Sequence, residues 1–298
     1  MALRVTQGMM NTQLLRNISN HMKRMSELQN QLSSGRRINA PSDDPVGITF
    51  ALRYRTELAA NEQYQENADA ALSQLDYVDT LLDQVNQVLQ RVRELAVKGA
   101  NGTNPQDALD AISAEVEELY QQLVDIGNSK LNGKYVFNGQ LTDVKPYPEQ
   151  NASAVSTDDR AIQYEVGAGL HIPVNVTGNE VFGTPGEADN IFKIMEQMIT
   201  DLAAGDHGKI GDALELIDQR ISKVLDARAT IGARTNRIEL VSGRLEDIGI
   251  NLQTLQSKIE DADMAEVITN LKMAENVYQA ALSTGAMLIR PSLVDFFR

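Results

Sequence analysis

One stretch of the chain, residues 68–96, constrains the fold more than any other, because apolar side chains recur there at alternating spacings of three and four. The positions are Ala68, Ala71, Leu75, Val78, Leu82, Val85, Leu89, Val92 and Ala96. A helix with this period buries one continuous seam against a partner helix. This stretch is therefore predicted to lie in a long helix of a coiled-coil rod.

A second long seam runs through residues 209–262, and it matches in length the helix predicted over residues 46–98. Each helix has about 53 residues, or roughly 80 Å at 1.5 Å per residue. The second seam comprises Ile210, Leu214, Ile217, Ile221, Val224, Ile231, Ile238, Val241, Leu245, Ile248, Leu252, Leu255 and Ile259. Equal lengths favour pairing of the two helices.

Two shorter apolar stripes, within residues 104–126 and 187–202, add further helices to the predicted bundle. The later one is expected to begin at Pro185, because Thr184 and Glu187 have the spacing of a capping box.

The period changes after residue 127, where short alternating segments predict strands. Residues 134–139 suggest a strand and turn, and alternation returns within residues 162–166 and 170–176. Residues 143–159 are rich in Pro, Asn, Ser and Asp and are predicted to form a loop. A small β insert is therefore expected at one end of the bundle.

Residues 32–45 are predicted to form a joint between two helices. Gly35 occupies a helix C-cap position, and Pro41 disfavours continuation of that helix. Asp44 is the expected N-cap of the next helix, with Pro45 as its first residue. A second joint is predicted near residue 263, where Asp263 and Glu266 have capping-box spacing.

Beyond each joint lies one short helix with a single seam, and the two seams are predicted to pair with each other. The N-terminal seam comprises Leu14, Ile18, Met25, Leu28 and Leu32, and the C-terminal seam comprises Val267, Leu271, Ala274, Tyr278 and Leu288. Isolated helices of about 20 to 25 residues are marginal in water. These helices are therefore expected to order on assembly.

The predicted fold class is mainly α: an elongated helical bundle or coiled-coil rod with a small β insert. Five segments are expected. Residues 1–43 form an N-terminal assembly helix and joint, 44–141 the first half of the rod, 142–183 the insert, 184–263 the second half, and 264–298 the C-terminal assembly helix.

Composition excludes several classes of function. The formal net charge of −14 offers no basic patch for nucleic acid, and the absence of cysteine removes disulfides and thiolate chemistry. No apolar run is long enough for membrane insertion, and residues 1–19 carry no secretory signal. His21, His171 and His207 share no motif, so no metal site and no cofactor are expected.

Paired carboxylates are the remaining hint of catalysis. Asp43 with Asp44, and Glu260 with Asp261 and Asp263, have the residue types of an acid and base pair. Helix capping accounts for each group by spacing alone. The chain is therefore predicted not to be an enzyme.

Four stretches together resemble the bacterial flagellin superfamily. They are LSSGRRINAPSDDP at residues 32–45, LQRVRELAVKGANGTN at 89–104, YVFNG at 135–139 and IEDADMAE at 259–266. Within it, PSDDP at 41–45 and PSLVDFF at 291–297 resemble the hook-associated members that join hook to filament. LQRVRELAV at 89–97, with Asn11, Thr12 and Gln13, resembles the flagellins of the filament. The tail and the joint favour the hook-associated members, which lie at the hook-filament junction, and a flagellin subunit of the filament is the alternative.

The resemblance implies a structural subunit of the flagellum, exported unfolded by the flagellar type III apparatus with an uncleaved N-terminal signal. The implied partners are the first hook-associated protein, flagellin, further copies of the chain in a ring, and an export chaperone that binds the C-terminal segment. A cytoplasmic coiled-coil adaptor would fit the heptads equally well, but it does not explain the two mirrored joints.

In flagellin, a segment similar to residues 89–97 is bound by an innate immune receptor. Arg91, Leu95 and Glu115 or Glu118 would be the comparable groups here. The alternative interpretation is that Arg91 and Arg93 are solvated flanks of the seam.

Overall fold

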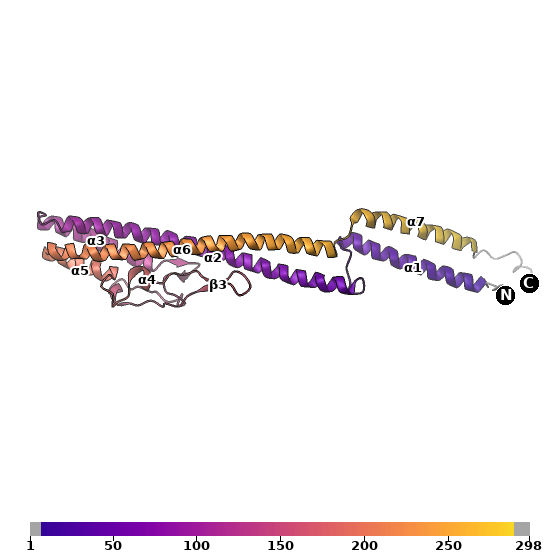
Figure 1. Ribbon diagram of the computed structural model, residues 1–298, viewed down its shortest axis with the longest axis horizontal. Helices are drawn as coiled ribbons and strands as arrows, with labels where there is room; N and C mark the ends of the chain where they lie inside the picture. The colour runs from indigo at the N-terminus through magenta and orange to yellow at the C-terminus, as the bar shows by residue number, and fades with distance from the viewer. Residues whose placement is uncertain (1–6, 289–298) are drawn as a thin grey trace, which may run out of the picture. The chain divides into compact units, whose positions relative to one another are not determined.

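The structure, a computed structural model, describes residues 7–288 and is mainly α, as predicted (Figure 1). Its helices are α1 (Gln7–Ser34), α2 (Pro45–Gly99), α3 (Gln106–Gly127), α4 (Gly178–Phe182), α5 (Ile191–Ala204), α6 (His207–Glu260) and α7 (Met264–Leu288). Between α3 and α4 lie β1 (Lys130–Leu131), β2 (Lys134–Tyr135), the 3-10 helix η1 (Ala152–Ala154), β3 (Gln163–Glu165) and β4 (His171–Pro173).

The chain divides into two compact units, and each is described by itself. Of the described residues, 7–60 and 248–288 belong to the first unit, and 61–247 belong to the second. The two longest helices contribute to both units: α2 has 55 residues and α6 has 54. The first unit contains α1 and α7, and the second contains the insert.

The seam of residues 68–96 forms the core of the second unit. All nine of its positions are 0% exposed, which confirms the prediction of a buried coiled-coil seam. Side chains of α6 complete this core, among them Ile217, Val224, Ile231 and Ile238. Because α3 also packs against α5, the second unit is the predicted helical bundle.

The insert is held to the bundle by aromatic side chains. The Tyr147 ring lies 5.3 Å from the Phe182 ring and 4.9 Å from the Phe192 ring, measured between centroids. Phe137 packs edge-on against Phe182 at 5.5 Å. Since Phe192 belongs to α5, the insert shares the core of the bundle rather than forming one of its own.

The strands of the insert are much shorter than the alternation of apolar residues predicted. They form two separate antiparallel pairs, β1 with β2 and β3 with β4. Beyond β4 the Asn175 side chain takes over the pairing, accepting from the Ile162 amide at 2.9 Å and donating to the Arg160 carbonyl at 3.1 Å. The alternating residues up to Val176 are therefore buried outside a strand.

The helix expected to begin at Pro185 begins instead at Ile191, with Asn190 as its N-cap. The Asn190 side chain accepts from the Lys193 amide at 3.1 Å. Thr184 and Glu187 close only a turn, in which the Thr184 amide donates to Glu187 Oε2 at 3.3 Å. A complete capping box does occur, at Thr177 and Glu180, and it starts α4.

Candidate functional site

The N-terminal joint begins where α1 ends at Ser34. Gly35 has a φ of +70°, a conformation that favours glycine, and its amide donates to the Gln31 carbonyl at 2.9 Å. These features end α1 just before Gly35, the C-cap position predicted from the sequence.

Asp44 starts α2 by capping its first amides. Its Oδ1 accepts from Gly47 N at 2.8 Å and from Val46 N at 3.2 Å, and Pro45 is the first helical residue. A Cβ on Gly47 would lie 2.5 Å from Asp44 Oδ2. Glycine at this position therefore leaves room for the cap.

Asp43 does not cap a helix, which corrects the interpretation drawn from its spacing. Its Oδ2 accepts from Ala40 N at 2.8 Å and from Asn39 N at 3.0 Å, so it closes the loop that contains Pro41. These amide hydrogen bonds lower the pKa of the Asp43 carboxyl. A carboxylate held in this way is a poor general base.

The C-terminal joint begins a new helix at Met264. Asp263 Oδ1 accepts from Ala265 N at 2.9 Å and from Glu266 N at 3.1 Å. The Glu266 carboxylate accepts from Asn270 Nδ2 at 3.4 Å. Asp263 is thus an N-cap.

The two joints are hydrogen-bonded to each other, which no local pattern in the sequence predicted. Arg37 N donates to the Glu260 carbonyl at 2.6 Å, and Ala262 N donates to the Gly35 carbonyl at 3.0 Å. Arg36 and Asp261 consequently form an antiparallel β-bridge. This bridge brings the end of α1 next to the start of α7.

Glu260 is the residue of this region that sequence reasoning missed, because spacing suggested helix capping. Its side chain is 1% exposed and lies 2.7 Å from Arg55 Nη2 and 3.6 Å from Arg36 Nε. Burial raises the pKa of the Glu260 carboxyl, but hydrogen bonds from Arg55 and Gln256 and the charges of Arg55 and Arg36 outweigh it and lower the pKa. The sequence does not show which arginines lie near Glu260. Its role as a buried ion-pair partner could therefore be recognised only from the structure.

The terminal seams meet as α1 and α7 run side by side (Figure 1). Leu28, Val267, Leu271 and Ala274 form a cluster in which each side chain is at most 9% exposed. Met25, Leu32 and Ala262 pack around this cluster.

Towards the other end of this helix pair, α1 and α7 remain in contact. A Cβ on Gly285 would lie 2.9 Å from Leu14 Cδ2. Ile18 and Tyr278 are half-buried. Leu288 ends α7, and its side chain lies outside the described residues.

Large apolar side chains are exposed mainly in the first unit, which contains 16 of the 21 found among the described residues. On α1 and α7 they are Met9, Met10, Leu15, Met22, Met264, Ile268, Met273, Val277, Leu282 and Met287; on α2 and α6 they are Val46, Phe50, Leu52, Ile248, Ile250 and Leu255. Ile248 and Leu255 were predicted to lie on the buried seam, but they are 37% and 42% exposed. An excess of exposed apolar side chains in one unit favours that unit as the part of the chain that contacts other proteins.

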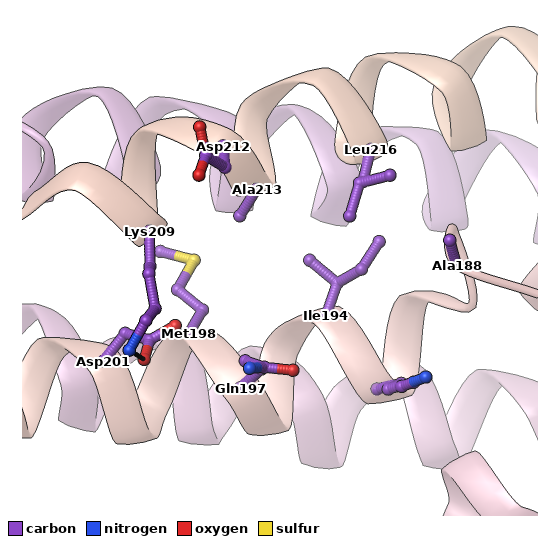
Figure 2. A pocket seen from close by; sticks show the side chains of 10 residues that line it. Ala188, Ile194, Gln197, Met198, Asp201, Lys209, Asp212, Ala213 and Leu216 are labelled. Carbon is purple, nitrogen blue, oxygen red and sulfur yellow. Dashed lines mark ion pairs between the residues drawn. The ribbon is translucent and has the colours of Figure 1, made fainter. Parts of the chain in front are cut away.

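A pocket between α5 and α6 lies in the second unit (Figure 2). Ile194, Met198 and Leu216 supply its apolar lining, and Lys209 Nζ lies 3.8 Å from Asp201 Oδ1 at one end. Its volume of about 240 Å³ is below the range of about 300 to 1,000 Å³ typical of small-molecule sites. The pocket gives no reason to infer a substrate.

The described residues contain no cluster of side chains suited to a metal ion. His21, His171 and His207 lie on α1, β4 and α6, respectively, and are not brought together. Within residues 7–288, none of the helices has an apolar stretch long enough to cross a membrane.

The comparisons with known proteins decide the family. The bacterial flagellin N-terminal helical region matches residues 5–142, and the bacterial flagellin C-terminal helical region matches residues 214–297. The chain belongs to the bacterial flagellin family. Both joints lie within the matched regions. Membership makes it a structural protein of the bacterial flagellum rather than an enzyme, and it removes the cytoplasmic adaptor as an alternative.

Relatives of two kinds span nearly the whole of this flagellin-family chain. Flagellar hook-associated protein 3 of Escherichia coli K12 is 25% identical over 94% of the chain and 95% of its own length. Flagellin of Bacillus subtilis 168 is 28% identical over 94% of both proteins. A putative flagellar hook-associated protein from Vibrio parahaemolyticus has the same fold, with a TM-score of 0.68 and 22% identity over 74% of this chain and all of that one.

The two arginines of the flagellin-like segment 89–97 form ion pairs within the second unit. Arg91 Nη2 lies 2.6 Å from Glu115 Oε1, Arg91 Nη1 lies 2.8 Å from Glu94 Oε2, and Arg93 bonds Asp218 at 2.6 Å. These ion pairs fit the interpretation of the arginines as flanks of the seam.

Proposed function

We propose that this chain is a junction subunit of the flagellum that joins the hook to the flagellin filament. The observation that carries the proposal is the exposed apolar surface of the first unit, which a single copy leaves in water. Burial of such surface against neighbours is the main driving force for association. Hook-associated protein 3 of E. coli is similar over nearly the full length of both proteins, and the stretches PSDDP at 41–45 and PSLVDFF at 291–297, which resemble the hook-associated members, support the choice of the junction.

The partners in this proposal are the first hook-associated protein on one side, flagellin on the other, and further copies of the chain in a ring. An export chaperone would bind the C-terminal segment before secretion. The stretch PSLVDFF at residues 291–297, which resembles the junction proteins, lies outside the described residues.

The proposal also assigns a role to each segment of the chain. Residues 1–43 and 264–298 serve assembly, 44–141 and 184–263 form the rod, and 142–183 form the insert. The terminal helices order fully when neighbouring copies cover their outer faces, because a single seam does not offset the conformational entropy of about 1 to 2 kcal/mol per ordered residue.

A second candidate function is that of a filament flagellin, which the 28% identity to B. subtilis flagellin favours. The two functions predict different assemblies. A junction subunit occupies a short zone next to the hook, whereas a flagellin extends along the filament.

Labelled antibody against this chain on intact flagella tests the proposal. We expect label confined to the boundary between hook and filament, and we expect purified chain to cap hooks without growing long filaments. Label along the filament, or long self-seeded filaments of pure protein, would show that the chain is a flagellin.

A further inference from the structure

Glu260 occupies an unfavourable position for a carboxylate. It is the last residue of α6, where the helix dipole repels negative charge, and its side chain is 1% exposed. Its Oε1 has no hydrogen-bond partner among the described residues. Helix stability alone does not account for a buried anion at this end of α6.

The groups that compensate this charge come from three separate segments. Arg36 follows α1, Arg55 lies on α2, and Gln256 lies one turn before Glu260 on α6. Gln256 Nε2 donates to Glu260 Oε2 at 3.3 Å, and Arg55 Nη2 donates to the same oxygen at 2.7 Å. We call Arg36, Arg55, Gln256 and Glu260 together the joint clamp.

The main chain strengthens the same connection. The carbonyl of Glu260 accepts from Arg37 N at 2.6 Å, and Arg37 Nη2 donates to the Ile259 carbonyl at 3.0 Å. Side chain and backbone of Glu260 therefore bind both the N-terminal joint and α2. A buried ion pair of this kind specifies which groups meet more than it stabilises the fold, since apolar packing often stabilises a buried site equally well.

The register of the α1–α7 pair depends on this connection. The bridge of Arg36 with Asp261 sets where α1 ends relative to the start of α7, and Leu28 and Leu271 meet only a few turns beyond it. A shift of one residue at the bridge would rotate each seam out of contact.

We propose that Glu260 is a positioning residue: through Arg36 and Arg55 it holds the two joints together and sets the register in which the terminal seams pair. The clamp is closed in the single chain, before neighbours cover α1 and α7. Its role in assembly rests on the proposed function, but its role in the joint does not.

Amide hydrogen exchange on the full-length monomer tests the clamp at the Arg37 and Ala262 amides, which lie in different joints. With Glu260→Gln we expect both amides to exchange about tenfold faster, because a charge-assisted hydrogen bond is weakened. Amides of the second unit should keep their rates. Glu57→Gln is the matched control, since Glu57 pairs with Arg53 at 2.8 Å on the surface of the same unit, and it should change neither amide.

Arg55→Gln and the double variant with Glu260→Gln show whether Arg55 and Glu260 act through the same interaction. We expect the double variant to exchange no faster at Arg37 and Ala262 than Glu260→Gln alone. Unchanged exchange in Glu260→Gln would overturn the proposal. So would equal acceleration in the second unit, or an absence of protection at both amides in the unaltered chain.

Incorporation into flagella then separates this proposal from the proposed function. We expect Glu260→Gln to be exported and to assemble at least tenfold less than the unaltered chain. Normal assembly of a variant whose joint exchanges faster would overturn the positioning role. An unaltered chain with a protected joint that is absent from the junction would overturn the proposed function and leave the clamp standing.

Discussion

Arg220 lies on α6 in the second unit with 0% of its surface exposed, which is rare for an arginine. Its Nε donates to the Asp189 carbonyl at 2.8 Å, and its Nη2 lies 2.8 Å from Asp189 Oδ2 and 2.9 Å from Glu187 Oε2. A Cβ on Gly183 would lie 2.5 Å from Arg220 Nη2, so glycine is needed there. The arginine thus anchors the segment before α5 to α6.

We expect Arg220→Ala to lower the free energy of unfolding of the second unit by about 3 to 5 kcal/mol, because it removes a buried guanidinium that donates to the Asp189 and Glu180 carbonyls and leaves the buried Asp189 carboxylate with Lys223 as its remaining cation. Urea unfolding of the full chain measures the change. Arg93→Ala is the control: Arg93 and Asp218 are 44% and 50% exposed, so the loss should stay below about 1 kcal/mol. Equal losses in the two variants would contradict this account.

The stability of the fold should depend on pH through Glu187, which also pairs with Arg220. The hydrogen bond from Arg220 outweighs burial and lowers the pKa of the Glu187 carboxyl below its ordinary range. A lowered pKa in the folded state stabilises the fold above the unfolded-state pKa, and this contribution disappears as the pH falls through the folded-state value. We expect Glu187→Gln to destabilise the protein at pH 7 and to match the unaltered chain at a pH low enough to protonate Glu187 in both the folded and the unfolded states. A difference in urea midpoint that persists undiminished in acid would contradict the assignment.

At the scale of elements, α1 and α7 differ from α2 and α6 in how much of their surface the chain itself covers. Their shared cluster contains only four buried side chains, whereas the seam of α2 is buried along residues 68–96. Helices with so small a buried face depend on further partners for their stability. Substitutions on this seam should therefore act on assembly more than on the monomer.

We expect Leu28→Asp and Leu271→Asp to leave the thermal unfolding of the second unit unchanged and to abolish incorporation into the flagellum. A carboxylate has no partner inside the closed seam. Leu240→Asp is the control, since Leu240 is 78% exposed on the part of α6 in the second unit, and it should assemble normally. Normal assembly of either seam variant, or a fall of several degrees in its melting temperature, would show that the seams are not assembly elements.

At the scale of the whole molecule, limited proteolysis should divide the chain at its joints. We expect protease to trim both ends and to leave a core near residues 44–263, because each terminal helix has one small seam and no other core. Mass spectrometry of the products measures the boundaries. Survival of the intact 298-residue chain, under conditions that digest a disordered control, would count against it.

The sequence by itself determined the long helices, the seam of the second unit and the ends of α1 and α2. These depend on short-range physics: the three-four spacing of apolar residues is a property of one helix, and caps such as Gly35 and Asp44 bond amides within a few residues. The helical elements could therefore be predicted well, including the start of α7 at Asp263.

Only the tertiary structure decided which polar groups are buried and where the insert stops pairing. Asp43 and Asp44 are neighbours with the same side chain, yet one closes a loop and the other caps a helix. Glu260 meets Arg55 across about 200 residues of chain, and Asn190 rather than Thr184 starts α5. The physical reason is that the partner of a charge or an amide depends on which distant segments approach it, and no local period records that approach.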